Sequence, residues 1–470
     1  MSMSSSATVG LACSRFLGGS RFVAALAASS IGLLSQCANL SGGAGGIEGE
    51  WFVGRICAEG AKLNSAPGAP SLGSDSLFGI QFDRLGAGGG ASKNCLFVSD
   101  PGVHPHERVL PDGEVAGAVW AVDPSGLDTV WSTEGGDGDI GFGTQLLAMP
   151  DVDGDGWGEC LVGRPRSGTG GLYRVCLLSG SSGAHLYCIE APLHVAVPLP
   201  GLVRIGDLDC DGTDDFLVTL SALAVERTGG VAAMAVSSRT GRLLYEVYAP
   251  GGVQRPSGAG GALGDLNSDG VEDFALDFFG YGEAGGSSAS PMECVVYSGS
   301  SGAQLGAWGH EVFDVAVISD GDCRDGGGLY SYDGQVLEFI DAVTMKVRRR
   351  WEFDWNGGPL LWGDVDEDGF PDVFFCRRSS SAGGKWAALF LTGTGARRYV
   401  VGTEDDDVDR FGERIVSIGD VDRDGVTDLA VGVDQGGAPY PGRIYVASGA
   451  NGSILGSLWR LGCRVEFVEY

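Results

Sequence analysis

The chain has 470 residues, with 61 acidic residues, 31 Lys and Arg residues and a formal net charge of −30 at pH 7. Such acidity argues against nucleic acids and anionic membrane surfaces as partners, because both are polyanions. The 82 glycines and the short apolar runs between turn residues are typical of an all-β fold. A chain of this length can form several domains or one large repeat array.

Residues 1–40 have the pattern of a signal peptide for export. Arg15 and Arg21 precede an apolar run at residues 22–34, which is too short to span a membrane. The segment before Cys37 resembles a lipoprotein cleavage box, but Gln36 is not the small residue expected there. We therefore expect a secreted or cell-surface protein without a lipid anchor at Cys37. Residues 41–77 are rich in Gly, Ser and Pro and predict a linker.

A nine-residue acidic pattern recurs five times along the chain. Asp or Asn stands at positions one, three and five, Gly at position six, and Asp or Glu at position nine. These side chains, with the backbone carbonyl at position seven, could surround one Ca²⁺ ion, which takes roughly six to eight oxygen ligands. The expected ligands of about five Ca²⁺ sites are Asp151, Asp153, Asp155, Trp157 and Glu159; Asp207, Asp209, Asp211, Thr213 and Asp215; Asp265, Asn267, Asp269, Val271 and Asp273; Asp364, Asp366, Asp368, Phe370 and Asp372; and Asp420, Asp422, Asp424, Val426 and Asp428.

The flanks of these acidic loops distinguish them from an EF-hand, which begins in the same way. An EF-hand has its closing Glu at about position twelve and lies between helices. Here the acid at position nine is followed by short apolar runs, such as Phe216–Leu220 and Leu429–Val433, which predict strands. The alternative is an acidic turn of the Asx type that binds no metal.

A second signal follows each acidic loop and predicts a tight hairpin turn, in which Gly supplies the positive φ angle that such turns need. The clear copies are Ser179–Gly183, Ser237–Gly241, Ser298–Gly302, Thr392–Gly395 and Ser448–Gly452, and weaker ones are Asp123–Gly126 and Asp341–Thr344. A Phe-Gly pair precedes the acidic loop at Phe142-Gly143 and Phe411-Gly412, and Phe78-Gly79 stands correspondingly in a first unit without acids. Each unit therefore reads as strand, acidic loop, strand, strand, tight turn, strand.

Repeats of four short strands predict the blades of a β-propeller. Both signals together indicate seven four-stranded blades over residues 78–459, with residues 460–470 as a tail or closing strand. The fifth unit carries a degenerate loop at residues 318–326, with its acids out of register, and the first has none. We do not expect metal in these two units.

The Phe-Gly pairs and the acidic loops resemble the FG-GAP, or VCBS-type, repeat family, which includes the propeller heads of integrin α subunits and many secreted bacterial proteins. The resemblance covers residues 78–459. It implies Ca²⁺ with a largely structural role in the five loops, and ligand binding on a loop-rich face of the disc. The ligand would be an extracellular protein or polysaccharide.

Other motifs are weaker evidence for chemistry. His104 and His106 could hold a transition metal, yet no third ligand stands near them, and the Gly-rich run at residues 136–141 is too acidic for a phosphate site. The acidic run at residues 404–409 reads as a solvated loop or as a patch for a cationic partner. Cys160 and Cys176 should lie on consecutive strands, but disulfide pairing cannot be deduced from sequence. We expect the ten Trp residues to pack between blades rather than to bind sugars.

These observations favour a calcium-binding adhesion or interaction module without catalysis of its own. The alternative is an extracellular hydrolase or lyase built on the propeller, which would need carboxylates and His to converge in one pocket. A third possibility is a quinone-dependent dehydrogenase, since Ser-Gly turns also occur in that propeller family, but we expect no such cofactor.

Overall fold

The computed structural model describes nineteen segments of the chain: residues 81–83, 93–101, 117–135, 141–165, 173–191, 201–220, 230–250, 254–280, 290–310, 314–318, 328–332, 336–352, 359–363, 372–377, 386–391, 396–402, 411–433, 443–461 and 464–469. All the elements within these segments are β-strands. None of the described residues belongs to a helix that could cross a membrane. The expected signal peptide at residues 1–40 and the linker at residues 41–77 lie outside the described residues.

The strands form seven antiparallel sheets in the described part of the chain. The first contains β1 (Gln81–Asp83), β2 (Leu96–Asp100), β3 (Ala118–Asp123) and β4 (Asp128–Glu134). The second contains β5 (Gln145–Ala148), β6 (Cys160–Pro165), β7 (Tyr173–Leu178) and β8 (His185–Ala191). The third contains β9 (Leu202–Arg204), β10 (Phe216–Thr219), β11 (Val231–Val236) and β12 (Leu243–Tyr248).

The remaining sheets follow in chain order. The fourth contains β13 (Gln254–Gly264), β14 (Asp273–Gly280), β15 (Ser290–Tyr297) and β16 (Gln304–His310). The fifth contains β17 (Asp314–Ile318), β18 (Gly328–Tyr332), β19 (Val336–Asp341) and β20 (Lys346–Glu352). The sixth contains β21 (Pro359–Gly363), β22 (Asp372–Arg377), β23 (Trp386–Leu391) and β24 (Ala396–Gly402). The last contains β25 (Phe411–Gly419), β26 (Asp428–Val433), β27 (Arg443–Ala447), β28 (Ile454–Leu461) and β29 (Arg464–Glu469).

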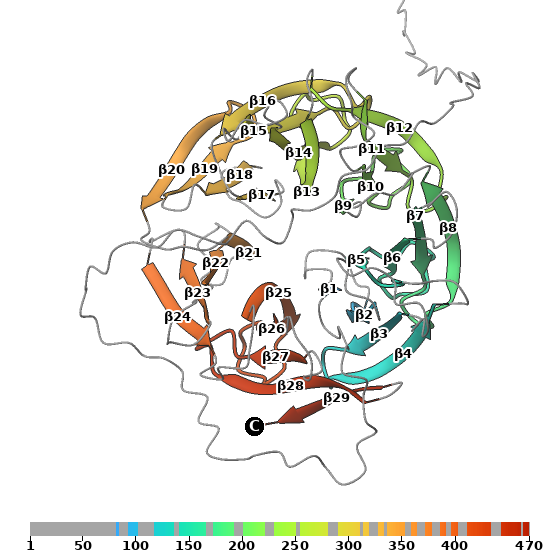
Figure 1. The fold of residues 1–470 in the computed structure, drawn as a ribbon, viewed down its shortest axis with the longest axis vertical. Helices are drawn as coiled ribbons and strands as arrows, with labels where there is room; N and C mark the ends of the chain where they lie inside the picture. The colour runs from blue at the N-terminus through green and yellow to red at the C-terminus, as the bar shows by residue number, and fades with distance from the viewer. Residues whose placement is uncertain are drawn as a thin grey trace, which may run out of the picture.

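The sheets are arranged around a ring (Figure 1), which confirms the prediction of an all-β propeller. Within each sheet the strands are hydrogen-bonded in chain order, from the first strand near the centre to the last at the rim. The prediction of four-stranded blades is correct for six sheets and wrong for the last, because β29 pairs with β28 and adds a fifth strand. The first and fifth units, which lack the regular acidic loop, still form complete sheets.

Burial follows the position of a strand in its blade. All four residues of β10 are buried, because both faces of this strand lie against neighbouring sheets. The rim strand β4 alternates between exposed residues and residues that are partly or fully buried, since only one of its faces packs inward. A continuous apolar run and an alternating one therefore mark the middle and the rim of a blade.

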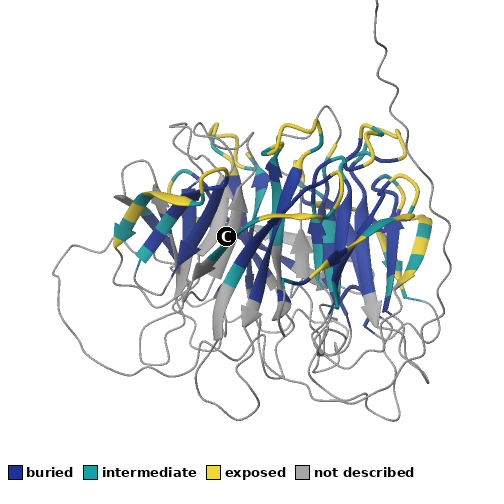
Figure 2. Cartoon of the chain, turned by 90° about the horizontal axis from the view of Figure 1, so that it is seen from above, coloured by how far each residue is buried: buried dark blue, intermediate teal, exposed yellow. Residues whose placement is uncertain are grey.

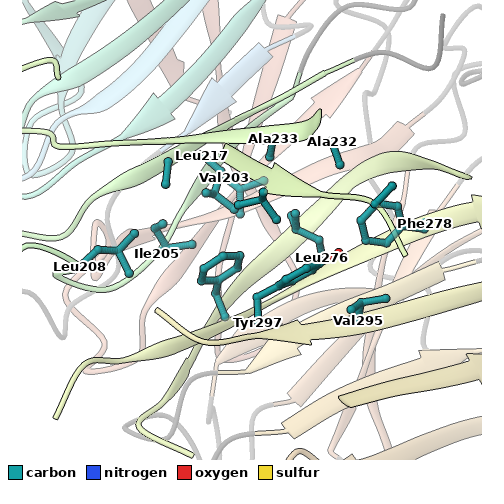
Figure 3. Packing of buried hydrophobic residues seen from close by; sticks show 14 residues of the cluster. Val203, Ile205, Leu208, Leu217, Ala232, Ala233, Leu276, Phe278, Val295 and Tyr297 are labelled. Carbon is teal, nitrogen blue, oxygen red and sulfur yellow. The ribbon is translucent and has the colours of Figure 1, made fainter. Parts of the chain in front are cut away.

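The core lies between the sheets rather than within any one of them. Figure 3 shows one such cluster, in which Val203 and Leu217 of the third sheet pack against Leu276, Phe278 and Tyr297 of the fourth. A single sheet could not bury these side chains, so each blade depends on its neighbours for stability.

The ring closes by packing of side chains between the first and last sheets. Leu96 and Trp120 of the first sheet share a buried cluster with Ile444 and Leu458 of the last. The added strand β29 also contacts β4, the rim strand of the first sheet. No described strand of the first sheet pairs with a strand of the last.

Aromatic residues on the rim strands of the first three blades join each of these blades to the hairpin turn of the next. Trp131 of β4 donates a hydrogen bond from Nε1 to the carbonyl oxygen of Gly180 at 2.7 Å, which confirms inter-blade packing for this Trp. The hydroxyl of Tyr187 on β8 donates to the carbonyl of Ser238 at 2.5 Å, and that of Tyr245 on β12 donates to the carbonyl of Gly299 at 2.6 Å. The turn is thus a recurring contact point between these successive blades.

Candidate metal centre

The acidic loops connect the first and second strands of their blades. Four are fully described, at residues 151–159, 207–215, 265–273 and 420–428, whereas only Asp372 of the loop at 364–372 lies in a described segment. The tight turns between the third and fourth strands lie beside these loops, since a Cβ at Gly180, Gly299 or Gly449 would fall within 2.0 Å of a backbone oxygen of the loop. In Figure 2, exposed connections gather along one face of the disc.

The described tight turns have the predicted form, but two of them end one residue later than predicted. The N–H of Gly183 donates to the carbonyl of Ser179 at 2.8 Å, and the turns at 237–241, 298–302 and 448–452 repeat this bond. The weaker copies each end one residue later than predicted, at Leu127 and Met345, which adopt the same positive φ as the glycines. The turn at 392–395 lies outside the described residues.

All four described loops share one backbone conformation. The glycine at position six has a φ between 88° and 92°, and no atom would lie within 4 Å of an added Cβ. Gly is therefore needed here because of the positive φ angle, and not because a larger side chain would clash with its neighbours. Position four also has a positive φ, in Gly154, Cys210, Ser268 and Arg423, although the residue type varies there.

The acid at position one holds the loop closed through backbone N–H groups. Both carboxylate oxygens of Asp207 accept hydrogen bonds, from the N–H of Asp211 at 3.0 Å and of Gly212 at 2.7 Å. Asp265 and Asp420 accept the corresponding pairs, and Asp151 accepts from Gly154 and Gly156. These are Asx-type contacts, so the loop conformation is set by local hydrogen bonds.

The acid at position nine is fully buried in all five repeats, where Glu159, Asp215, Asp273, Asp372 and Asp428 each have 0% exposure. In three loops it joins the acidic loop to the turn. Asp215 accepts from the N–H of Leu208 and of Ser238, both at 2.9 Å, and Asp273 and Asp428 accept from the equivalent loop and turn residues.

Glu159 departs from this arrangement because its side chain is one methylene longer. Its Oε2 accepts from the N–H of Val152 at 2.5 Å, while its Oε1 is buried and has no hydrogen-bond partner. Burial raises the pKa of Glu159 to about 8 and that of Asp215 to about 7. The pKa values of Asp273 and Asp428 are also raised, with burial as the main cause.

The loop at 151–159 brings together all four of its predicted acidic ligands. Oxygen atoms of Asp151, Asp153, Asp155 and Glu159 all lie within 4.8 Å of one another. This donor set, hard carboxylate oxygens around a common centre, suits Ca²⁺. The group also contains the buried Oε1 of Glu159, which has no hydrogen-bond partner. A bound cation would supply the missing partner for this oxygen.

Two other loops bring together three of their four acids. Asp207, Asp209 and Asp215 converge within 4.8 Å, and so do Asp420, Asp422 and Asp428. The acid at position five is missing from both groups: Asp211 lies 3.4 Å from Arg239, and Asp424 accepts the N–H of Val426. Asp211 and Asp424 therefore lie outside the converging groups, and their role as ligands stays a prediction.

The loop at 265–273 forms no three-acid group of this kind among the described residues. Its third position is Asn267, whose amide nitrogen donates to Asp269 at 2.9 Å. Hydrogen bonds, chiefly from Ser300, lower the pKa of Asp269. Asp364, Asp366, Asp368 and Phe370 lie outside the described residues, and the carbonyls of Trp157, Thr213, Val271 and Val426 remain predicted ligands.

The turn supplies contacts that the acidic pattern alone does not reveal. In the second sheet, Ser179 and Ser181 donate from their hydroxyl groups to Oδ2 of Asp155, at 3.3 and 2.5 Å. In the fourth sheet, Ser298 and Ser300 make the same bonds to Asp269. The sequence Ser-Gly-Ser-Ser-Gly occurs in the turns of these two units, and this shared motif is the feature from which the serine contacts could have been predicted.

The structure decides the cysteine pairing, which the sequence left open. Cys176 on β7 forms a disulfide with Cys188 on β8, and Cys160 on β6 remains a buried thiol. The Nδ1 atom of His185 lies 3.6 Å from Sγ of Cys188. His104, His106, the run at 136–140 and the acids at 404–409 lie outside the described residues.

Comparison with known proteins supports the repeat type and the fold. Residues 414–447 match the family model of the FG-GAP repeat, and this segment contains the acidic loop at 420–428. No curated protein matches the chain.

Solved structures resemble the chain only distantly. The rhamnogalacturonan lyase YesW has 13% identity and a TM-score of 0.40, over 80% of this chain and 75% of the lyase. The quinohaemoprotein alcohol dehydrogenase from Comamonas testosteroni has 11% identity and a TM-score of 0.42, over 77% of this chain and 65% of the dehydrogenase. BBS1N, in its complex with ARL6DN, has 10% identity and a TM-score of 0.44, over 79% of this chain and 93% of BBS1N.

Proposed function

Because this chain is a β-propeller that contains an FG-GAP repeat, we propose that it is a secreted binding module whose acidic loops hold Ca²⁺ and that has no catalytic activity of its own. The ion would bind chiefly at residues 151–159, 207–215 and 420–428, where carboxylates converge. The partner would be an extracellular protein or polysaccharide.

The observation that carries the calcium proposal is the buried Oε1 of Glu159. This atom has no hydrogen-bond partner and belongs to a carboxylate grouped with Asp151, Asp153 and Asp155. A buried carboxylate without a partner is costly, and burial accordingly raises the pKa of Glu159. A cation would favour the ionised form and offset the repulsion among the four acids.

Two features support secretion. The disulfide between Cys176 and Cys188 is of a kind that persists in oxidising compartments, and FG-GAP repeats are typical of extracellular proteins. Expression of the full chain in a bacterial host tests this proposal. We expect the mature protein outside the cytoplasm with its N-terminus within residues 35–45, and retention of an uncleaved chain in the cytoplasm would contradict secretion.

Thermal unfolding of the full-length protein tests the calcium proposal. The protein would be stripped with EGTA and then measured with Ca²⁺, with Mg²⁺ or with no added ion. We expect Ca²⁺ to raise Tm well above the stripped value and Mg²⁺ to do so less, because Mg²⁺ gives up its water ligands reluctantly. An equal Tm with and without Ca²⁺ would overturn the proposal.

A matched pair of variants assigns the effect to the loop. Glu159→Gln keeps the shape of the side chain but removes its charge, and we expect it to reduce the Ca²⁺-dependent rise in Tm. Glu190→Gln, on the rim strand of the same sheet, removes an exposed carboxylate that pairs with Arg174. This control should retain the full calcium response, and an equal loss in both variants would mean that the response does not come from the loop.

A further inference from the structure

Three potential metal ligands meet on the hairpin of β7 and β8, in the second blade. Sγ of Cys176, Sγ of Cys188 and a ring nitrogen of His185 all lie within 4.8 Å of one another. Cys176 and Cys188 are directly opposite each other in the strand register, and His185 is the first residue of β8. The tight turn at 179–184 brings these residues together although they are spread over thirteen positions of the sequence.

The distance between the imidazole and one sulfur already suits a tetrahedral ion, whereas the two sulfurs are joined in a disulfide and must separate before both can bind it. For Zn²⁺ with bonds of about 2.3 Å to sulfur and about 2.0 Å to nitrogen, tetrahedral angles place a sulfur and a nitrogen roughly 3.6 Å apart. The observed distance from Nδ1 of His185 to Sγ of Cys188 is 3.6 Å. Two thiolates of the same ion would lie roughly 3.8 Å apart, a separation that opposite residues on paired strands can reach by side-chain rotation.

The surroundings position the imidazole and leave room for an outside ligand. The His185 ring lies against the ring of Phe142, with 6.4 Å between the centroids, and Phe142 itself is buried. Cys176 is buried, while His185 and Cys188 are exposed. An ion at this point would have three protein ligands and a fourth position open to water.

We propose that the reduced form of this cluster binds a zinc ion through Cys176, Cys188 and His185. A dithiol reductant supplies two electrons and two protons, which break the Sγ–Sγ bond and leave two thiols, while the reductant becomes a disulfide. Zn²⁺ then binds the two thiolates and displaces both thiol protons to solvent. The disulfide and the zinc site exclude each other, so the surroundings determine whether β7 and β8 are joined by a covalent bond or by a metal.

The proposed ligands differ in kind from those of the acidic loops. Two thiolates and an imidazole favour a soft or borderline ion such as Zn²⁺, whereas the acidic loops offer only hard oxygens. The zinc proposal is independent of the proposed function. Saturating Ca²⁺ in every sample keeps the acidic loops out of the measurement.

Cobalt titration of the full-length protein is the test, because tetrahedral Co²⁺ bound to thiolate absorbs strongly in the near ultraviolet. The protein would be reduced with dithiothreitol, desalted without oxygen, checked for folding by circular dichroism, and titrated with Co²⁺ and then Zn²⁺. We expect thiolate-to-cobalt absorption that saturates near about one equivalent and disappears on addition of Zn²⁺. The oxidised protein should show none. Absence of this band in the reduced protein, or its presence in the oxidised protein, would overturn the proposal.

Three variants identify the ligands. Cys188→Ser should abolish the band, and Cys210→Ser, which removes an exposed free thiol from another blade, should leave it unchanged. His185→Phe keeps a ring against Phe142 and leaves the disulfide intact for folding, and it should weaken Co²⁺ and Zn²⁺ binding by at least about 10-fold. If Cys188→Ser fails to fold, the His185→Phe result decides, and unchanged affinity in that variant would overturn the three-ligand site.

Discussion

At the scale of single residues, the difference between Asp and Glu at position nine changes what the carboxylate does. Asp215 reaches backbone N–H groups of both its loop and its turn, so both of its oxygens have hydrogen-bond partners. Glu159 reaches only the loop with one oxygen, and the other remains buried without a partner. Among the four loops that are fully described, the loop at 151–159 therefore has the strongest physical need for a cation.

The raised pKa of Glu159 predicts how the metal-free protein responds to pH. Burial raises its pKa from the ordinary value of 4.5 to about 8 in the folded protein, so between these values the folded state binds more protons than the unfolded state. Stability of the metal-free protein should therefore fall as pH rises through this window, by at most about 1.4 kcal/mol per pH unit for this group. Denaturant unfolding in EGTA at pH 5 and pH 8 measures the fall.

The control for this pH effect is Glu159→Gln, which cannot titrate at this position. Its loss of stability between pH 5 and pH 8 should be smaller than that of the unchanged protein. Saturating Ca²⁺ should also reduce the loss, because the ion favours the ionised carboxylate. If the variant and the unchanged protein lose equal stability, Glu159 does not titrate in this range.

At the scale of elements, a large side chain on the rim strand of one blade packs against a small residue in the turn of the next blade. A Cβ at Gly241 would lie 2.8 Å from Cδ2 of the Tyr187 ring, so the small turn residue makes room for the aromatic ring. Gly183 faces Trp131, Gly302 faces Tyr245, and Gly452 faces Tyr399 in the same way. Between the fourth and fifth sheets the sizes are reversed: Gly306 stands on the rim strand and Met345 ends the turn, with its side chain 3.9 Å from a Cβ placed on Gly306.

The Tyr187 hydroxyl should contribute measurably to the contact between the second and third blades. Tyr187→Phe removes the hydrogen bond to the Ser238 carbonyl and leaves the ring in place, so we expect a loss of about 1 kcal/mol in the free energy of unfolding. The matched control is Tyr248→Phe, because the exposed Tyr248 donates its hydroxyl hydrogen bond to Glu246 on its own strand rather than to the next blade. The control should stay within about 0.5 kcal/mol in denaturant titrations, and a Tyr187→Phe value equally small would contradict the role of the hydroxyl.

The reversed pair of Gly306 and Met345 predicts that the large and the small residue can also be exchanged at another junction between a rim strand and a turn. Gly241→Met alone should destabilise strongly, because the new side chain meets the Tyr187 ring, and Tyr187→Gly alone should leave a cavity. The double variant should recover part of the loss, with a coupling energy of about 1–3 kcal/mol in a double-mutant cycle. Additive losses in the double variant would show that the two positions do not pack against each other.

At the scale of the whole molecule, the ring is closed without exchange of strands between the described parts of the first and last sheets. Leu96 and Trp120 pack against the last sheet, and β29 pairs along β28 and contacts β4. The junction thus depends on buried apolar side chains and on one additional strand. This differs from the other junctions, which lie between sheets that follow each other in the chain.

Truncation after Leu461 tests the role of β29 in holding the ring closed. Removal of this strand deletes its hydrogen bonds to β28 and its contact with β4, so we expect a lower Tm and faster proteolysis within the first and last sheets. A chain that lacks only Tyr470 serves as the control, because it retains all of β29. Equal Tm values for the two truncated proteins would mean that the ring does not need the fifth strand.

Much of the blade could be predicted because its signals are local. The acidic loop is shaped by hydrogen bonds within nine residues, from Asp207 to Gly212 for example, and the turn at 237–241 is closed by one bond from Gly241 to Ser237. Such short-range geometry is specified by residue type at fixed spacing. The sequence left residues 460–470 as a tail or a closing strand, and their pairing with β28 could not be predicted, because no local pattern in residues 464–469 specifies which strand edge they pair with.

The sequence by itself determined the all-β class, the order of elements in each blade and the positions of the acidic loops, since these depend on contacts between near neighbours in the chain. Only the tertiary structure decided that Glu159 keeps an oxygen without a partner, that Cys176 meets Cys188 and His185, and that Tyr187 reaches the next blade. Those contacts depend on strand register and on the packing of neighbouring sheets, which the residue pattern of a single repeat does not specify.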